Sequence, residues 1–388
     1  IRDHATEYYA SKNFNIWYIF GVLSTVVLMI QLLTGLFLTM SYKPSVQEAF
    51  DSVEYIMRSV EWGWLIRYMH STGSSFFFIV VYLHMFRAML YGSYKKPREL
   101  IWIIGMLIYF CLMAEAFFGY LLPWGNMSYW AAGVIVNLFT AIPIIGETLA
   151  EWIRGDYYIS DITLNRFFAF HVFALPIALI ALVVAHILAL HHVGSNNPDG
   201  IEIKDYKDEE GKPVDGVAFH PYHTSKDLVG ITIFLIFYCA AVFFVPEMGG
   251  LFLEVDNFEP ANPLQTPEHI VPAWYYTPYY AILRAVPNKL IGAIILVSAV
   301  LCFVILPWLD KCKVKSIRYR GWQYKLALYL FALSFLVLGY LGMMPATGIY
   351  VILARVFTVI YFAFFLLMPF YTRFENTKPV PNRVIYKK

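Results

Sequence analysis

Charged side chains are scarce in this chain of 388 residues. Lys, Arg, Asp and Glu together make up 14% of the sequence, whereas apolar residues make up 59%. A soluble domain carries roughly a quarter charged residues, so this shortage argues against a soluble enzyme and favours a protein that faces lipid. The formal net charge is only +2 and no long basic run occurs. We therefore expect no nucleic-acid partner.

Cysteine is equally scarce, and its spacing argues against two further kinds of site. The four cysteines, Cys111, Cys239, Cys302 and Cys312, stand far apart. The sequence contains neither a CxxC pair nor a CxxCH motif. A disulfide framework and a covalently attached c-type heme are therefore not supported.

Long apolar segments, by contrast, are abundant. A membrane-spanning helix needs about 20 mainly apolar residues. Such segments occur at 17–40, 64–91, 100–121, 162–190, 228–246, 289–309, 323–341 and 347–370. The sequence therefore predicts an all-α integral membrane protein with eight transmembrane helices in a lipid bilayer.

Basic residues are divided unevenly between the two sides of these spans. An even number of spans places both termini on one side, and that side would carry 21 of the 29 lysines and arginines. Cytoplasmic segments of membrane proteins are enriched in lysine and arginine, so we expect cytoplasmic termini. The first twelve residues are polar, and no cleavable signal peptide is expected at this end.

Two loops on the opposite, outer side are long and partly apolar. Residues 122–160 contain an apolar stretch broken by Pro143 and Gly146, and residues 247–288 are rich in proline and aromatic residues. A loop that only joined two spans would not need such residues. We expect surface or re-entrant helices that frame a pocket or a docking surface.

Four histidines form the clearest pattern within the spans. His70 and His84 are separated by 14 residues, which return to within about 40° of one helix face and rise roughly 21 Å. His171 and His186 are separated by 15, an overshoot of about 60° that a kink at Pro176 could absorb. The two helices run parallel, so the first member of each pair meets near the outer side and the second near the inner side. Two stacked b-type hemes would require such an arrangement.

Glycines and arginines match the histidine spacing. Gly21 and Gly35 in the first span, like Gly105 and Gly119 in the third, are 14 residues apart, so a flat macrocycle could lie against bare backbone at each histidine level. Arg67 precedes His70 by three residues and Arg87 follows His84 by three, where each could bind an anionic heme propionate. The alternatives are ordinary small-residue helix packing and arginines that reach from helix ends to the membrane surface.

Several motifs carry a family resemblance. These motifs are RYMHSTGSS with YLHMFR, GYLLPWGNMSYW, ALHHVGSNNPDG, FHPYHTSKDL, TPEHIVPAWY and ILRAVPNKL. The chain resembles cytochrome b of the cytochrome bc1 complex, a quinol:cytochrome c oxidoreductase, from end to end. The resemblance implies a heme-binding four-helix bundle over residues 1–192, with two non-covalent b-type hemes. Residues 193–388 would supply the last four spans and a loop of the quinol site.

The resemblance also implies an activity and partners. Quinol would be oxidised at an outer site, and quinone would be reduced at an inner site, in a proton-motive Q cycle. A Rieske iron–sulfur protein, cytochrome c1 and a second copy of the chain would be the partners. The 15-residue spacing and an altered outer motif favour a bacterial cytoplasmic membrane, with the mitochondrial inner membrane as the alternative.

For the inner quinone site, the family pattern carries over to His191, Ser195, Lys226 and Asp227. A histidine and a carboxylate can each hydrogen-bond a quinone carbonyl and deliver protons to it. His223, in contrast, is expected to be solvated at the interface.

The outer site departs from the family pattern. The family usually has a Pro-Glu-Trp-Tyr motif whose glutamate accepts a quinol proton, but residues 272–275 read PAWY. We expect Glu268 to supply the missing proton acceptor and Tyr275 to hydrogen-bond quinol. Ala131 replaces a common glycine and should narrow the pocket for bulky inhibitors, while Asn126 replaces the usual glutamine.

Two other kinds of protein could carry intramembrane histidines. An eight-helix transporter or channel would place charged residues near mid-membrane on several helices, and it would not need the glycine spacing. A second bis-histidine cytochrome, such as a dehydrogenase anchor, is generally shorter and lacks the PxWY-type loop.

Overall fold

A computed structural model describes residues 8–382 of the chain. Within these residues, eight helices are long and apolar enough to cross a membrane, as the sequence predicted. They are α2 (Phe20–Thr39) extended by η1 (Ile16–Tyr18), α4 (Gly63–Tyr91), α5 (Glu99–Leu121), the continuous α8 (Asp161–Ala169), η3 (Phe170–Ala174) and α9 (Leu175–Val193), α10 (Phe219–Phe244), α12 (Lys289–Leu309), α13 (Trp322–Met343) and α14 (Gly348–Leu366). Four basic residues counted toward the sidedness prediction lie outside the described range, namely Arg2, Arg383, Lys387 and Lys388.

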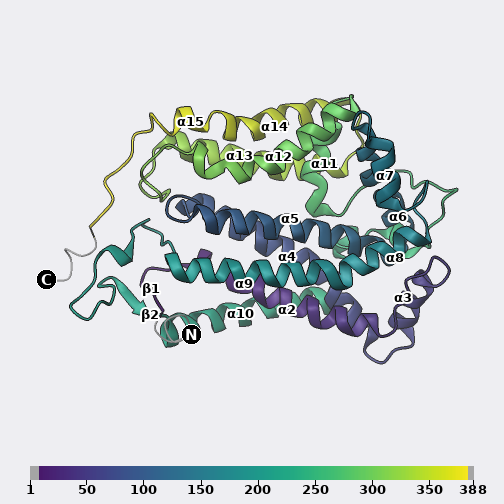
Figure 1. Cartoon of the computed structure of the whole chain (residues 1–388), viewed down its shortest axis with the longest axis horizontal. Helices are drawn as coiled ribbons and strands as arrows, with labels where there is room; N and C mark the ends of the chain where they lie inside the picture. Colours follow the sequence, from purple (N-terminus) through teal and green to yellow (C-terminus); the bar gives the residue numbers. More distant parts are fainter. Residues whose placement is uncertain (1–7, 383–388) are drawn as a thin grey trace.

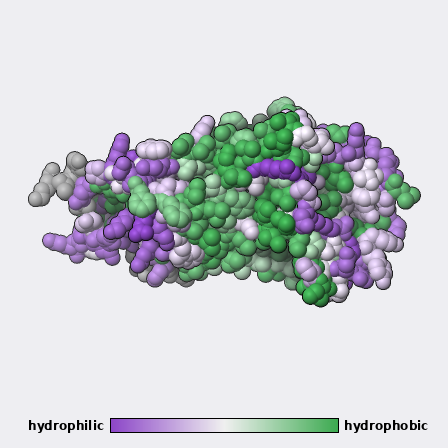
Figure 2. Space-filling model, turned by 90° about the horizontal axis from the view of Figure 1, so that it is seen from above, coloured by the Kyte–Doolittle hydropathy of each residue, from purple (hydrophilic) through white to green (hydrophobic). Residues whose placement is uncertain are grey.

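The spanning helices lie side by side in one bundle (Figure 1). Helix α2 packs on α4 and α5 packs on α9, while α12, α13 and α14 form a layer beyond α5. Figure 2 shows apolar side chains over the middle of the molecule and hydrophilic side chains gathered toward both ends. This distribution suits a protein whose middle is solvated by lipid tails.

Short elements cover the two ends of the bundle. One end, which we call outer, carries α3 (Ala49–Arg58), α6 (Asn126–Leu138), η2 (Phe139–Ala141), α7 (Gly146–Arg154), η5 (Met248–Gly250), η6 (Val255–Phe258), η7 (Trp274–Tyr276) and α11 (Thr277–Arg284). The other end, called inner, carries η4 (Ile203–Asp205), α15 (Met368–Tyr371) and the antiparallel pair β1 (Tyr9–Ser11) and β2 (Gly216–Ala218). The helices predicted within the two long outer loops are thus confirmed.

The fourth span absorbs its extra residue next to Pro176, but by a π-helical turn and not by a simple kink. In η3 the Leu175 N–H bonds the carbonyl of Phe170, five residues earlier. Pro176 has no N–H, and its ring pushes against the carbonyl of Val172, which favours a wider turn here. Such a turn takes up one residue, so the 15 residues from His171 to His186 rotate nearly as far as 14 residues of α-helix.

The fifth span starts earlier than the sequence predicted. It was expected from residue 228, whereas α10 begins at Phe219 and contains one non-helical residue, His220, with φ −93° and ψ 134°. The first turns are polar and lie at the interface, so an apolarity criterion alone does not detect them.

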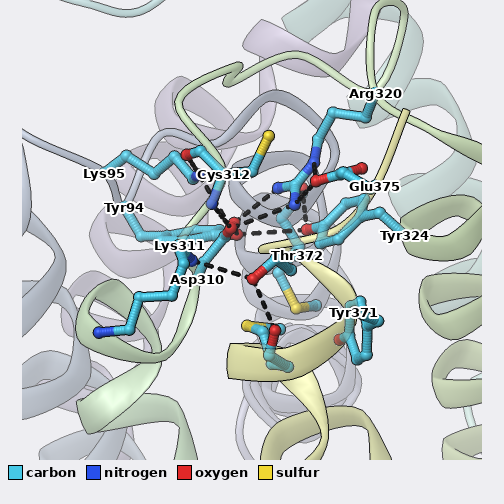
Figure 3. A network of polar contacts seen from close by, with 12 residues as sticks. Tyr94, Lys95, Asp310, Lys311, Cys312, Arg320, Tyr324, Tyr371, Thr372 and Glu375 are labelled. Carbon is cyan, nitrogen blue, oxygen red and sulfur yellow. Dashed lines mark hydrogen bonds and ion pairs between the residues drawn. The ribbon is translucent and has the colours of Figure 1, made fainter. Parts of the chain in front are cut away.

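Buried ions join three segments at the inner end (Figure 3). Asp310 pairs with Lys95 at 3.0 Å and with Arg320 at 2.6 Å, and Arg320 also pairs with Glu375 at 2.5 Å. The Tyr94 hydroxyl donates a further hydrogen bond to Asp310. Because these residues come from the α4–α5 loop, the α12–α13 loop and the C-terminal segment, the network clamps all three together.

Candidate functional site

The four intramembrane histidines meet in two pairs. The ring centres of His70 and His171 are 6.1 Å apart at an interplanar angle of 88°. Those of His84 and His186 are 6.4 Å apart at 63°. A metal ion held between two imidazole nitrogens at about 2 Å from each would separate the ring centres by roughly 6 Å. Each pair is therefore spaced to hold one metal between its rings.

In both histidines of the outer pair, a hydrogen bond at Nδ1 fixes the ring and leaves the lone pair of Nε2 free. Nδ1 of His171 lies 2.9 Å from the backbone carbonyl of Glu115, which can only accept, so Nδ1 carries the proton and Nε2 is free. The Thr34 hydroxyl donates to the carbonyl of Ile30 at 2.6 Å, and its oxygen lies 3.0 Å from Nδ1 of His70. His70 therefore also donates from Nδ1, as metal-binding histidines typically do.

Each of the four glycines faces one of the histidines. A Cβ atom added at Gly119 would overlap the ring of His171. Cβ atoms at the other three would lie 3.1–3.3 Å from a ring carbon; these pairs are Gly35 with His70, Gly21 with His84, and Gly105 with His186. The missing side chains thus make room for the imidazoles themselves.

Both candidate propionate-binding arginines have unsatisfied buried nitrogens. Nη1 of Arg67 and Nε of Arg87 are buried without a hydrogen-bond partner in the described part of the chain. Unpaired buried cations are costly, so an anionic group at each level would complete them. No cluster of three or more metal-ligating side chains occurs among residues 8–382. Each level thus offers two histidine ligands and one arginine that needs an anionic partner. A heme, with its iron and its propionates, fits both requirements.

A large cavity at the inner level brings together the residues expected for the inner quinone site. It has a volume of about 840 Å³ and is lined by His84 and His186. The same cavity is lined by His191, Ser195, Lys226 and Asp227. Residues of α9 and α10, which are far apart in sequence, therefore line the same cavity as the inner histidine pair.

Two further residues of this cavity were not expected from the sequence. Tyr8 stacks on His191 with ring centres 4.5 Å apart, and its hydroxyl lies 2.8 Å from the hydroxyl of Ser195. His223 is buried, not solvated as predicted, because its Nε2 donates to the carbonyl of Ser11 at 3.0 Å. Both contacts depend on β1, which a sequence reading does not place here.

At the outer end, Tyr275 is buried and Glu268 is not. Tyr275 stacks on Phe78 of α4 with ring centres 3.9 Å apart and 4° between the planes. Glu268 is exposed, and no hydrogen bond or ion pair joins it to another residue within 8–382. Ala131 is buried in α6. The geometry therefore does not bring the Glu268 carboxylate into a buried site.

Another carboxylate, Glu254, lies beside Tyr275. It accepts a hydrogen bond from Asn257 at 3.2 Å, and Asn257 also donates to the Tyr120 hydroxyl at 3.1 Å. Burial raises the pKa of Glu254 to about 7, opposed by hydrogen bonds from Tyr120 and Asn257. Burial and then the nearby Glu254 carboxylate raise the pKa of Tyr275. Its place in a loop without a motif gave no sign of this contact.

Asn126 joins the two long outer loops. Its side-chain oxygen accepts from the backbone N–H of Asn262 at 3.0 Å, and its amide donates to the carbonyl of Gln265 at 3.2 Å. The residue that replaces the family's glutamine thus holds the loop after α10 against α6.

One carboxylate was overlooked although the sequence signals it. Glu115 is the only acidic residue in the eight spans predicted from the sequence. Ionisable residues inside a membrane are rare and usually functional. In the structure its Oε1 lies 3.1 Å from Nδ1 of His171.

Comparisons with known proteins agree with this geometry. The family model described as cytochrome b/b6/petB matches residues 5–194, and that described as cytochrome b (C-terminal)/b6/petD matches residues 260–362. Cytochrome b of Allochromatium vinosum is 59% identical over 99% of this chain and 94% of its own length. Cytochrome b of Rickettsia typhi is 46% identical over 98% and 93%.

A solved structure is also similar over almost its whole length. A chain described as part of a hyperthermophilic respiratory Complex III superimposes with a TM-score of 0.88 at 40% identity, covering 95% of this chain and 94% of its own. The two family models together cover most of the chain, and the relatives match it nearly from end to end. The chain therefore belongs to the heme-binding cytochrome b family.

Proposed function

We propose that the chain is the diheme subunit of a proton-motive quinol:cytochrome c oxidoreductase. The observation that carries the proposal is the two histidine pairs, His70 with His171 and His84 with His186, at opposite levels of one bundle. Two b-type hemes bound there would supply single-electron transfer across the membrane. The chain's own residues would bind the quinones, exclude water and move the protons.

At the inner site, a quinone head would lie in the cavity beside His84 and His186. His191 and Asp227 would hydrogen-bond its two carbonyl oxygens and deliver the protons of reduction. Ser195 would be a further polar contact, and Lys226, which is exposed, would supply protons from the surface. Tyr8 would hold the His191 ring in place by stacking on it.

At the outer site, Glu254 would accept a proton from quinol and Tyr275 would orient the quinol hydroxyl. A buried carboxyl with a pKa of about 7 is suited to act as a base at neutral pH. It would substitute for the carboxylate that Ala273 lacks. Glu268, the residue expected from the sequence, is the second candidate, and its exposure makes it the weaker one.

The partners follow from the same proposal. The iron–sulfur acceptor for one quinol electron would be a Rieske protein, and cytochrome c1 would follow it. A relative from Bradyrhizobium diazoefficiens is named cytochrome b/c1; it is 48% identical over 97% of this chain, which covers 53% of that protein. The complex would be a homodimer in a bacterial cytoplasmic membrane, with the termini in the cytoplasm.

The function is tested on the complex purified from membranes in mild detergent. We expect a reduced-minus-oxidised spectrum with b-type α bands, a redox titration with two one-electron components, and quinol-dependent reduction of added cytochrome c. A spectrum without b-type bands would falsify the proposal, because the proposed electron carriers are the hemes held by the two histidine pairs.

The outer-site assignment predicts a change in pH dependence. Below about pH 7 the Glu254 carboxyl is protonated and cannot accept a proton, and above it the carboxylate can. The rate of quinol oxidation should therefore rise with pH through this range. Glu254→Gln should lower the rate at pH 8 by about a hundredfold, the lower end of the loss typical of a missing general base, and should remove the rise.

The matched control is Glu268→Gln, which should leave rate and pH profile unchanged. The groups that face Glu254 are Tyr120, Asp256, Asn257 and Tyr275. If Glu268→Gln removed the rise and Glu254→Gln did not, the roles of the two residues would be reversed.

A further inference from the structure

The two histidine pairs differ in one charged neighbour. At the outer level, Nδ1 of His171 is 3.1 Å from the carboxylate of Glu115 as well as 2.9 Å from its backbone carbonyl. At the inner level, His186 lies beside the backbone of Ile101, and no acidic side chain of residues 8–382 forms such a contact with it. Each level also has one arginine, Arg67 or Arg87, so the carboxylate is the difference between them.

The 14-residue repeat of α5 identifies the inner counterpart of Glu115. Gly105 and Gly119, which face His186 and His171, are one repeat apart, and the residues one turn before them are Ile101 and Glu115. The backbone of Ile101 lies beside His186 as that of Glu115 lies beside His171. The same site on the helix thus holds an apolar side chain at one level and an acidic side chain at the other.

Glu115 has no other partner that would explain its place in the membrane. Its side chain is 16% exposed, and the basic side chain that it contacts within residues 8–382 is that of His171. Its second oxygen, Oε2, is buried without a hydrogen bond. A carboxylate in lipid is costly and usually functional, and the group that this one faces is the imidazole of His171.

We propose that Glu115, whose carboxyl group lies 3.1 Å from Nδ1 of His171, lowers the reduction potential of the outer heme relative to the inner heme. This inference rests on the proposed function, because it presumes a heme at each level. A carboxylate beside the N–H of a ligand imidazole makes the other ring nitrogen a stronger donor. A stronger donor and a nearby negative charge both stabilise the ferric form over the ferrous form. The electron then moves downhill from the outer to the inner level.

The test is a redox titration of the purified complex carrying Glu115→Gln. Glutamine keeps the size and the hydrogen-bond acceptor of the side chain but removes its charge. At a fixed ambient potential, the ferrous-to-ferric ratio of the outer heme should rise about tenfold, which is an upward midpoint shift of about 59 mV for one electron. The inner component should not move. The variant His70→Leu should lose the outer heme, so the component that is missing from its titration is the outer one.

A second variant tests the same idea in the opposite direction. Ile101→Glu places a carboxylate at the inner counterpart position and should lower the midpoint of the inner component while leaving the outer one unchanged. An outer midpoint that stays the same or falls in Glu115→Gln would overturn the inference. Two b-type components in the unmodified complex would keep the proposed function intact in that case, whereas their absence would remove the function itself.

Discussion

Alanine at position 119 should abolish binding of the outer heme and leave the inner heme in place. A Cβ atom there would overlap the ring of His171. The ring cannot turn aside freely, because its Nδ1 is held by the carbonyl of Glu115 at 2.9 Å. A displaced imidazole would no longer lie opposite His70. We expect the heme-to-protein ratio of the purified variant to fall by half, with loss of one component in the redox titration.

The control is the same substitution one helical repeat away. A Cβ atom at Gly105 would lie 3.3 Å from His186, a contact that a shift of a few tenths of an ångström relieves. The ring of His186 needs to move only by that amount, whereas the overlap at Gly119 requires the whole ring of His171 to leave its place. Gly105→Ala should therefore retain both hemes. Two hemes in Gly119→Ala, or the loss of the inner heme in Gly105→Ala, would contradict this explanation of the glycine spacing.

The parts of the fold that were predictable from the sequence depend on short-range periodicity. Lipid solvation requires about 20 apolar residues per span, so the eight spans can be counted directly. The rise and rotation of a helix place His70 and His84 at two levels of one face. Since their partners His171 and His186 lie on a parallel span with nearly the same spacing, the pairs follow without knowledge of any loop.

The remainder depends on contacts between segments that no local pattern relates. The π-helical turn at 170–174 differs from a proline kink only in its hydrogen-bond partners. Tyr8 reaches His191 because β1 pairs with β2, and Glu254 reaches Tyr275 because the loop after α10 folds back on the bundle. Glu115 is different, since a lone acid in an apolar span is a visible signal, although only the structure shows that it faces His171.

The clamp at the inner end should be the most sensitive point for stability. Arg320 has a fully buried side chain that pairs with Asp310 and Glu375 and lies over the ring of Tyr324, 3.5 Å from its centre. Arg320→Met would leave the two carboxylates with only the Lys95 ammonium between them. Breaking one partner out of a buried ion pair costs about 3–5 kcal/mol. We expect a large fall in the temperature at which the detergent-solubilised protein loses its heme absorbance.

A variant of the neighbouring Arg318 tests whether the buried network, or only the loss of a positive charge, causes the effect of Arg320→Met. It pairs with Asp199 at 3.0 Å, but its side chain is 47% exposed, and such pairs contribute only about 0–1 kcal/mol. Arg318→Met removes the same charge two residues away, yet it should change the free energy of unfolding little. The double variant Arg320→Met with Glu375→Gln should recover part of the loss, because the carboxylate whose ion-pair partner was Arg320 is then neutral. If the two single variants lowered the stability equally, the loss of one positive charge would explain both results. Burial of the clamp would then not be what stabilises the inner end.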